Sequence, residues 1–445
     1  MGVREDCVRP SPWLVVVLVG ATIGLVFAGI STYDFVQHLD RQVHTLHCSF
    51  IPGGTHDAGE SGCQVAMMSS YSSVMRTRVW GGVPISLPAM AVFAFIGLYA
   101  VDLLLTRRKS DPRATAFLAA ATALPALVSL IMLIISLSKL GTTCKLCVAI
   151  YTASALCVVG GIMTWRQAVR DAVIGGAVRP PGPPGQASSG AKLEQISDAP
   201  PATNGFLGAA LGIGVAFVLV PVLLYLALAP DHSRFIGTCE GLAQPTDPYG
   251  VMVKVDRRGG DVPAIEILDP LCPACKAFEG RLEQSGYADR LARKAVLFPL
   301  DKACNWMVTE STHPGACTVS EAVLCAGDRS PEVIAWAFEH SDQIRKDSAT
   351  DPAAAARLVK QRFPDLASCI GSPEARSRLN KSLRWLVANN IRVLTPQLFI
   401  DNVKLCDEDV DLGLEYTLTR MLERHASHTL RAVPLEQAPA RGGAR

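Results

Sequence analysis

Five apolar runs constrain this 445-residue sequence more than any other feature. They are Pro12–Phe35, Val83–Leu105, Ala114–Leu137, Leu146–Trp165 and Leu207–Ala229. Each has about 20 residues, the length with which an α-helix crosses about 30 Å of hydrocarbon. The first run could instead be a signal peptide, but no clear cleavage site precedes Tyr33 and more runs follow. We therefore predict a multi-pass helical membrane protein with five spans.

Basic residues predict how these spans are oriented. They lie before the first span (Arg4, Arg9), between the second and third (Arg107, Arg108, Lys109, Arg113) and after the fourth (Arg166, Arg170). If the spans alternate, all three places lie on one side, which the positive-inside rule makes cytoplasmic. All cysteines except Cys7 and Cys157 then fall on the outward side or its membrane edge. Such a distribution suits an oxidising compartment.

The chain after the fifth span has the pattern of a mixed α/β domain. Predicted strands are Val251–Val255, Val262–Leu268 and Ala295–Phe298, then a helical insertion over 319–389, then a hairpin of Val393–Ile400 and Val403–Leu405 turning at Asp401-Asn402. A closing helix is expected over 410–425. The predicted limits are 12–165 for a four-helix membrane domain, 171–204 for a flexible cytoplasmic linker, 205–229 for the fifth span, 235–427 for the soluble domain and 428–445 for a disordered tail.

Two Cys-x-x-Cys motifs carry the chemistry. Cys144 and Cys147 open the fourth span, and Cys272 and Cys275 follow the strand Val262–Leu268. Such a pair can release two electrons and close to a disulfide, and a helix N-terminus favours its thiolate. Neither motif is followed by the histidine that haem attachment needs. A four-cysteine zinc site would need a second pair with this spacing nearby, so we expect no metal.

The remaining outer cysteines form two groups. Cys239, Cys304, Cys317, Cys325, Cys369 and Cys406 are even in number and are expected to be structural, with Cys304 and Cys317 suited to a local bridge. Cys48 and Cys63 lie in the loop between the first two spans, and residues alone leave a static disulfide open for them. Idle thiols are the corresponding alternative for Cys144 and Cys147.

The soluble motif resembles the thioredoxin superfamily, and is closest to its DsbA-like branch. The resemblance rests on the segment 264–275 and covers about 251–424. It implies that Glu266, six positions before Cys272, handles protons beneath the disulfide. It also implies that Thr395 and Pro396 form the cis-proline turn that binds the substrate backbone.

The membrane motif, together with Cys48, Cys63 and Ser69, resembles the vitamin K epoxide reductase family over about 12–165. This resemblance implies a four-helix bundle that exchanges electrons between thiols and a quinone. Cys48 and Cys63 would pass electrons to Cys144, while Cys147 and Ser69 would face the quinone. Fourteen residues separate Cys48 from Cys63, about twice the usual gap in the family, and this departure bears on whether the two pair with each other.

Together these features predict a four-helix membrane core and fifth span joined to a thioredoxin-like domain in the periplasm, in a bacterial inner membrane. The expected function is a thiol–disulfide oxidoreductase that oxidises exported proteins with free thiols and passes electrons to the membrane pool of ubiquinone or menaquinone. Two alternatives remain: the same relay run as a quinone or quinone-epoxide reductase, and an anchored isomerase or chaperone without a quinone. No basic cluster with interleaved aromatics suggests nucleic acid.

Overall fold

The computed structural model describes residues 11–42, 44, 62–106, 108–177, 201–256 and 259–432. They form two compact units. The first comprises Met1–Met67, Tyr71–Val74 and Val83–Ala229, and the second Met68–Ser70, Met75–Gly82 and Pro230–Arg445, as far as these are described. Each unit carries one Cys-x-x-Cys motif.

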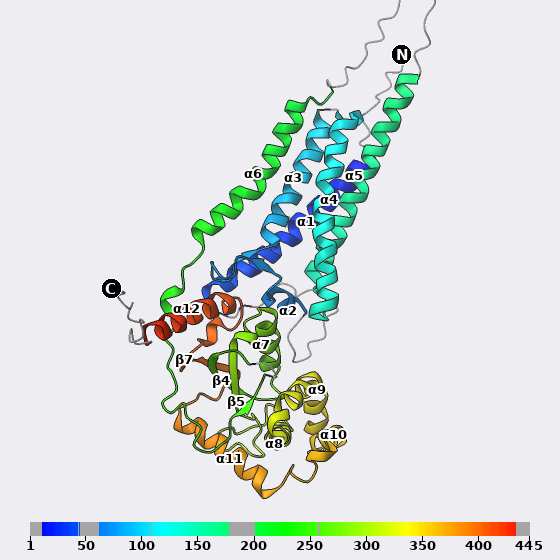
Figure 1. The fold of residues 1–445 in the computed structure, drawn as a ribbon. Helices are drawn as coiled ribbons and strands as arrows, with labels where there is room; N and C mark the ends of the chain where they lie inside the picture. The colour runs from blue at the N-terminus through cyan, green and yellow to red at the C-terminus, as the bar shows by residue number, and fades with distance from the viewer. Residues whose placement is uncertain are drawn as a thin grey trace, which may run out of the picture. The chain divides into compact units, whose positions relative to one another are not determined.

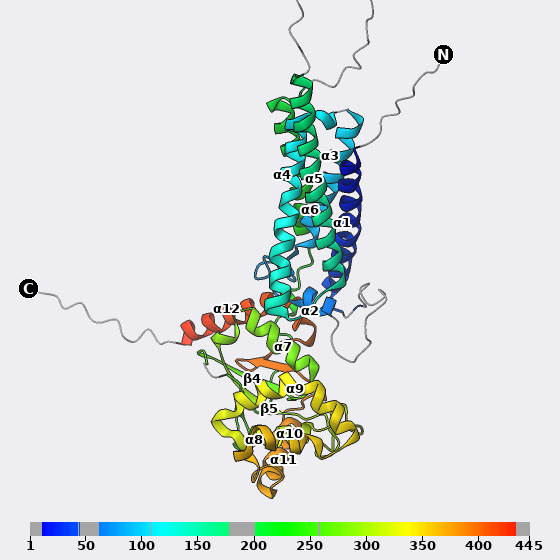
Figure 2. The ribbon, with the colours of Figure 1, turned by 90° about the vertical axis from the view of Figure 1, so that its right-hand side faces the viewer.

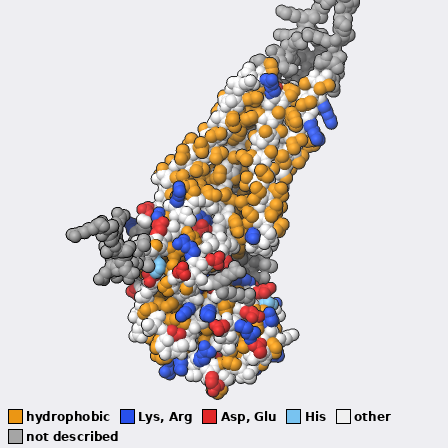
Figure 3. Space-filling view, in the orientation of Figure 1, with side chains coloured by type: hydrophobic (Ala, Val, Ile, Leu, Met, Phe, Trp, Pro, Cys, Tyr) orange, Lys and Arg blue, Asp and Glu red, His pale blue; other side chains and the backbone are white. Residues whose placement is uncertain are grey.

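Five helices in the first unit are long and apolar enough to cross a membrane. They are α1 (Pro12–Gln37), α3 (Ser86–Leu105), α4 (Pro112–Ile135), α5 (Lys145–Ala177) and α6 (Asn204–Leu228). Helix α1 packs against α3 and α5, α4 packs against α5, and α6 packs against α3 (Figures 1 and 2). On the face seen in Figure 3, hydrophobic side chains cover most of these helices, whereas charged side chains gather over the second unit. The helical membrane bundle predicted from the sequence is confirmed.

Small residues set the closest contacts of the bundle. A Cβ atom added to Gly160 of α5 would lie 2.8 Å from Cγ2 of Val17 and 2.9 Å from the carbonyl oxygen of Trp13, both on α1. Any side chain at this position would push the two helices apart. Close approach through small residues is a usual way for helices to pack in lipid, where water does not drive them together.

The turn before α5 follows from local backbone chemistry. Helix α4 ends in one π-helical turn, Ser136–Leu140, and Gly141 then adopts a φ of 61°, which glycine tolerates best. The chain reverses there and starts α5 at Lys145. Helix α5 then extends to Ala177, well past the apolar run that ends at Trp165 and into the segment expected to be a linker. The residues 178–200 that follow lie outside the described part of the chain.

The second unit is built on a five-stranded sheet in the order β3-β5-β4-β6-β7. The strands are β3 (Val253–Lys254), β4 (Val262–Leu268), β5 (Leu291–Leu297), β6 (Gln397–Ile400) and β7 (Val403–Lys404). Strands β4 and β5 are parallel and joined through α7 (Pro273–Gln284), and every other pair is antiparallel. The fold therefore has the predicted thioredoxin-like arrangement.

The predicted helical insertion lies between β5 and β6. It consists of α8 (Ala316–Ala326), α9 (Ser330–Thr350), α10 (Ala354–Arg362) and α11 (Pro373–Ala388), and α12 (Leu414–Ala432) closes the chain. Consecutive strand residues point to opposite faces of the sheet and pack in two separate cores. Leu268 and Leu297 pack in the core that includes α8 to α10, whereas Ile267 and Val296 pack in the core that includes Trp385 of α11.

Candidate redox sites

Both motifs place their first cysteine at the start of a helix. Cys144 immediately precedes α5, and the backbone N–H of Cys147 donates to its Sγ at 3.4 Å. Cys272 is the N-cap of α7, and the backbone N–H of Cys275 donates to its Sγ at 3.4 Å. All four cysteines are free thiols in this structure. An N–H group that has no partner within the helix and donates to sulfur stabilises the thiolate. Both first cysteines are therefore suited to nucleophilic exchange.

The membrane motif lies in an apolar cluster that also contains a loop cysteine. Cys63, Cys144 and Leu146 are buried together, and Phe27, Ile30, Ala66, Met67 and Cys147 pack against them. Cys63 belongs to α2 (Gly62–Met68). A Cβ atom on Gly62 would come within 2.5 Å of the Thr143 carbonyl oxygen, so glycine lets the start of α2 rest on the residues that precede Cys144.

Two other predicted members of the membrane site, Cys48 and Ser69, are not among the residues of this cluster. Cys48 lies outside the described residues. Cys63 is disulfide-bonded, and its partner also lies outside the described residues. Ser69 is buried directly after α2. The pairing of Cys48 with Cys63 and the quinone role of Ser69 stay predictions.

The soluble motif faces the predicted cis-proline turn. The peptide bond Thr395–Pro396 is cis, and the Cys272 thiol donates to the Thr395 carbonyl oxygen at 3.6 Å. The pKa of Cys272 falls to about 6, chiefly because the Cys275 side chain hydrogen-bonds to its sulfur. Burial and the charge of Asp269 oppose this, while Thr395 and the Cys275 N–H add to it. Burial raises the pKa of Cys275, so the pair divides into an exchange-ready thiolate and a protonated partner.

Glu266 lies on β4 in a cluster of charges around Arg293 of β5. The Arg293 guanidinium contacts Glu266 at 3.3 Å and Glu279 at 2.5 Å, and it also pairs with Asp256. Burial raises the pKa of Glu266 to about 8; Arg293 opposes the rise, whereas Glu279 and Asp256 add to it. One arginine cannot neutralise three carboxylates, so this cluster favours a proton on Glu266. Its proposed role in handling protons during exchange stays a prediction.

A histidine that the sequence did not single out lies near the soluble motif. His313 is 5% exposed, and its Nδ1 lies 2.7 Å from Oδ2 of Asp269. Asp269 is fully buried three residues before Cys272. A histidine in a loop far along the chain, with no spacing that relates it to a motif, gives no signal that sequence patterns could detect.

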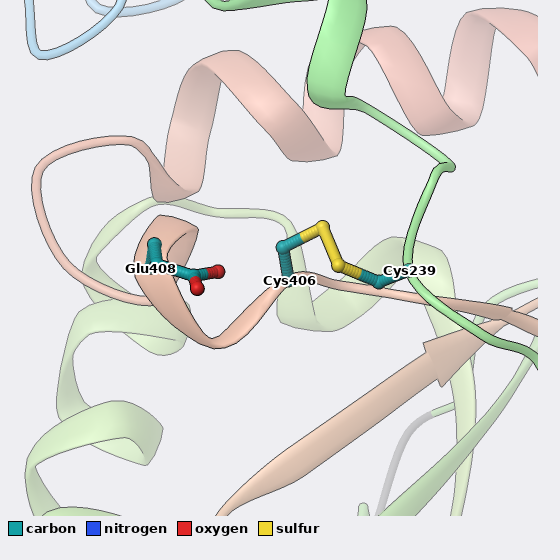
Figure 4. A group of neighbouring side chains, drawn as sticks. All are labelled: Cys239, Cys406 and Glu408. Atoms are coloured by element: carbon teal, nitrogen blue, oxygen red, sulfur yellow. A yellow bond between two sulfur atoms is a disulfide. The ribbon is translucent and has the colours of Figure 1, made fainter.

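The remaining cysteines of the second unit are paired. The disulfides are Cys239–Cys406, Cys304–Cys317 and Cys325–Cys369, so the local bridge predicted from the sequence is confirmed. Cys239, Cys406 and Glu408 offer donor atoms within 4.8 Å of one another (Figure 4). Because the two sulfurs are bonded to each other, neither is the thiolate that a metal ion would require.

The fold and these sites define a membrane-anchored disulfide oxidoreductase with two dithiol centres. Residues 15–161 match the family model described as "Vitamin K epoxide reductase family". This part of the chain is therefore similar to that family. The comparison with curated proteins gave no match.

Several solved structures are similar to part of this chain. Reduced DsbA1 from Neisseria meningitidis is 16% identical with a TM-score of 0.30, covering 43% of this chain and 94% of its own. A thioredoxin-like oxidoreductase from Silicibacter pomeroyi is 17% identical with a TM-score of 0.29 and coverages of 41% and 94%. The catalytic domain of Proteus mirabilis ScsC is 19% identical with a TM-score of 0.28 and coverages of 39% and 92%. The thioredoxin-like fold is defined by the strand order β3-β5-β4-β6-β7 and by the motif at the start of α7.

Proposed function

We propose that this protein generates disulfides in exported proteins and passes the electrons to a membrane quinone. Electrons would move from a client dithiol to Cys272 and Cys275, then through the loop cysteines Cys48 and Cys63 to Cys144 and Cys147. The observation that carries this proposal is the cluster in which the loop cysteine Cys63 packs with Cys144 and Cys147. A loop cysteine beside a free dithiol is the arrangement that intramolecular thiol–disulfide exchange needs.

The ionisation of Cys272 supports the oxidising direction. Stabilising the thiolate stabilises the reduced form, and a dithiol with a stable reduced form makes a stronger oxidant as a disulfide. A pKa of about 6 for Cys272 lies below that of a free cysteine, about 8.5. Client thiols therefore lose electrons to this motif more readily than to an unperturbed one.

Charge distribution supports placing both motifs on the periplasmic side of a bacterial inner membrane. Arg108 and Lys109 lie between α3 and α4, and Arg166 and Arg170 lie near the opposite end of α5 from Cys144. If those basic ends are cytoplasmic, the start of α5 and the chain after α6 both face outward. Electron transfer between the motifs then needs no passage across the bilayer.

The surroundings of Cys147 fit a quinone. Cys147 is only partly buried, and the neighbouring side chains include the apolar Phe27, Ile30 and Met67. A quinone bound here would supply an acceptor for two electrons and two protons. Cys147 would present its thiolate to that acceptor, and the apolar side chains would exclude water from the sulfur. Ubiquinone and menaquinone share this chemistry, so either would serve.

The test is anaerobic turnover of the purified full chain with a dithiol peptide and a quinone, followed by quinone absorbance. Wild-type protein is expected to reduce one quinone for each peptide disulfide formed, and Cys147→Ala to abolish reduction. Cys157→Ala is the matched control, because Cys157 is a buried thiol of the same helix outside the motif. Undiminished quinone reduction by Cys147→Ala would contradict the proposal.

Thiol trapping in cells distinguishes the direction of flow. An oxidase keeps Cys272 and Cys275 disulfide-bonded until quinone is depleted, whereas a quinone reductase fed from outside keeps them reduced. An isomerase without a quinone would oxidise or rearrange clients equally well when Cys144 and Cys147 are both replaced by alanine.

A further inference from the structure

The loop between β5 and α8 is fixed by a buried carboxylate and a disulfide. Asp301 accepts hydrogen bonds from the Ala303 N–H at 3.1 Å, the Ser311 hydroxyl at 2.8 Å and the Gly315 N–H at 2.9 Å. The Cys304–Cys317 disulfide closes the same loop. The loop therefore has a defined conformation, and His313 lies within it.

His313 is joined to the turn that opens the soluble motif. Its Nδ1–H donates to Oδ2 of Asp269, and Oδ2 also accepts from the Leu300 N–H at 2.8 Å. The other carboxylate oxygen accepts from the Leu271 N–H at 2.8 Å, and the Asp269 carbonyl accepts from the Cys272 N–H at 3.1 Å. The carboxylate is thus held by the backbone on both sides, and it joins the imidazole to the turn that ends at Cys272.

Three charged groups act on His313. They are Asp269, Cys272 and Arg345 of α9. Burial lowers the pKa of His313, but the hydrogen bond to Asp269 and the negative charges of Asp269 and of the Cys272 thiolate raise it above the usual value, against Arg345. Electrostatic coupling is reciprocal, so a proton on His313 favours the Cys272 thiolate. The negative charge of Asp269 acts the other way, because it raises the pKa of Cys272.

We propose that His313, held by Asp269, is a positioning residue whose positive charge stabilises the Cys272 thiolate and so sets the pH dependence of thiol–disulfide exchange. The inference rests only on the exchange chemistry of the proposed function, not on the quinone. No residue pattern assigns a role to either side chain.

The charge acts when Cys272 leaves. A client thiolate attacks Sγ of Cys272, a mixed disulfide forms, the Cys272–Cys275 bond breaks, and Cys275 takes up a proton. A second client thiolate then attacks the client sulfur, the client disulfide forms, and Cys272 departs as a thiolate. Two electrons pass from the client to the motif, and the positive imidazole of His313 offsets the charge that appears on Cys272.

The test compares His313→Asn with His425→Asn in the full chain. The Asn amide can still donate to Asp269 but carries no charge. His425 forms a second histidine–aspartate contact in the same unit, Nδ1 to Oδ2 of Asp401 at 2.9 Å. Alkylation of reduced Cys272 is measured from pH 4 to 9 by mass spectrometry of its peptide. His313→Asn is expected to raise the midpoint by about one pH unit, which reduces the thiolate fraction about tenfold at low pH. An unshifted midpoint, as expected for His425→Asn, would overturn the proposal.

A measurement on wild-type protein keeps the test valid if the variant folds poorly. The protein has nine histidines, whose ring carbons can be followed by NMR after selective labelling. Linkage requires one of them to titrate at higher pH in the reduced protein, where the Cys272 thiolate exists, than in the disulfide form. If no histidine changes its pKa between the two redox states, the coupling does not exist. Both measurements are made without quinone, so they succeed or fail independently of the membrane step.

Discussion

Cys144 and Cys272 share one local design although one opens a membrane helix and the other a soluble one. In each, the backbone N–H three residues on donates to the sulfur at 3.4 Å. That geometry follows from placing cysteine at the start of a helix, where N–H groups lack helical partners. At the residue scale, a Cys-x-x-Cys motif at the start of a helix is enough to form this hydrogen bond to the first sulfur.

The two cysteines of the soluble motif should behave differently when replaced by serine. Cys275→Ser is expected to accumulate a mixed disulfide, formed when the Cys272 thiolate attacks a client disulfide and releases one client thiol, because the buried resolving thiol that would free the client is gone. Cys272→Ser is expected to accumulate none, because Cys275 is fully buried with a raised pKa. Non-reducing gels of protein recovered from acid-quenched cells measure this. Adducts of Cys272→Ser linked through Cys275 would contradict the assigned roles.

Glu266 should make stability depend on pH. Its pKa rises from 4.5 to about 8 on folding, so between these values the folded chain keeps a proton that the unfolded chain releases. Raising the pH from 5 to 8 therefore lowers the free energy of unfolding of the wild-type protein by roughly a few kcal/mol. The variant Glu266→Gln should not show this decrease. Urea midpoints from pulse proteolysis at both pH values measure the effect.

The comparison variant for this prediction is Glu310→Gln, which changes an exposed glutamate of the same unit. It should leave the pH dependence as in wild type. If Glu266→Gln also leaves it unchanged, Glu266 is ionised in the folded protein across this range.

At the scale of elements, the hydrophobic pattern predicted the limits of strands whose buried residues are apolar. It did not predict the limits of a strand that buries a charged residue. Strand β4 has the predicted limits, Val262–Leu268. Strand β5 begins at Leu291 rather than Ala295, because Arg293 and Lys294 interrupt its apolar pattern. Arg293 is buried among three carboxylates from other elements, a compensation that no local pattern reveals. Helix α5 outlasts its apolar run for a different reason, since polar residues continue a helix as well as apolar ones.

The β6–β7 turn was predicted from Asp401-Asn402, and both residues have positive φ, 50° and 62°. Asn402 also accepts from the Leu242 N–H at 3.0 Å and donates to the Leu242 carbonyl at 3.2 Å. Asn402→Gly should keep the turn and lose these bonds, costing about 1–2 kcal/mol. Asn402→Ala should cost about 1 kcal/mol more, because alanine resists positive φ. Equal losses for the two variants, measured as urea midpoints, would show that the backbone conformation contributes nothing.

At the scale of the whole molecule, five spans and their basic ends predict which parts of the chain lie outside. A cysteine replacing Ser110, between α3 and α4, should react with a membrane-impermeant maleimide only after cells are permeabilised. A cysteine replacing the exposed Ala349 should react in intact cells. Mass spectrometry of labelled peptides separates these sites from the native cysteines. Labelling of both positions in intact cells would contradict the proposed orientation.

The molecule's architecture could be predicted from sequence because it depends on long patterns: apolar runs, strand alternation and motif spacing. Its electrostatics could not. Asp269 and His313 meet only after β5 and the following loop have folded, and the loop depends on Asp301 and a disulfide for its conformation. Three-dimensional placement of short polar side chains from separate segments leaves no periodic trace in the sequence.

The Cys239–Cys406 and Cys325–Cys369 disulfides join residues that lie 167 and 44 positions apart. Under the proposed orientation, a newly exported chain acquires these bonds as its second unit folds. Under the proposed activity, each fresh copy is a client of copies that are already mature. A daughter cell would then depend on mature protein received from its parent cell as well as on the gene. Cells depleted of the mature protein would regain disulfide formation only after a lag.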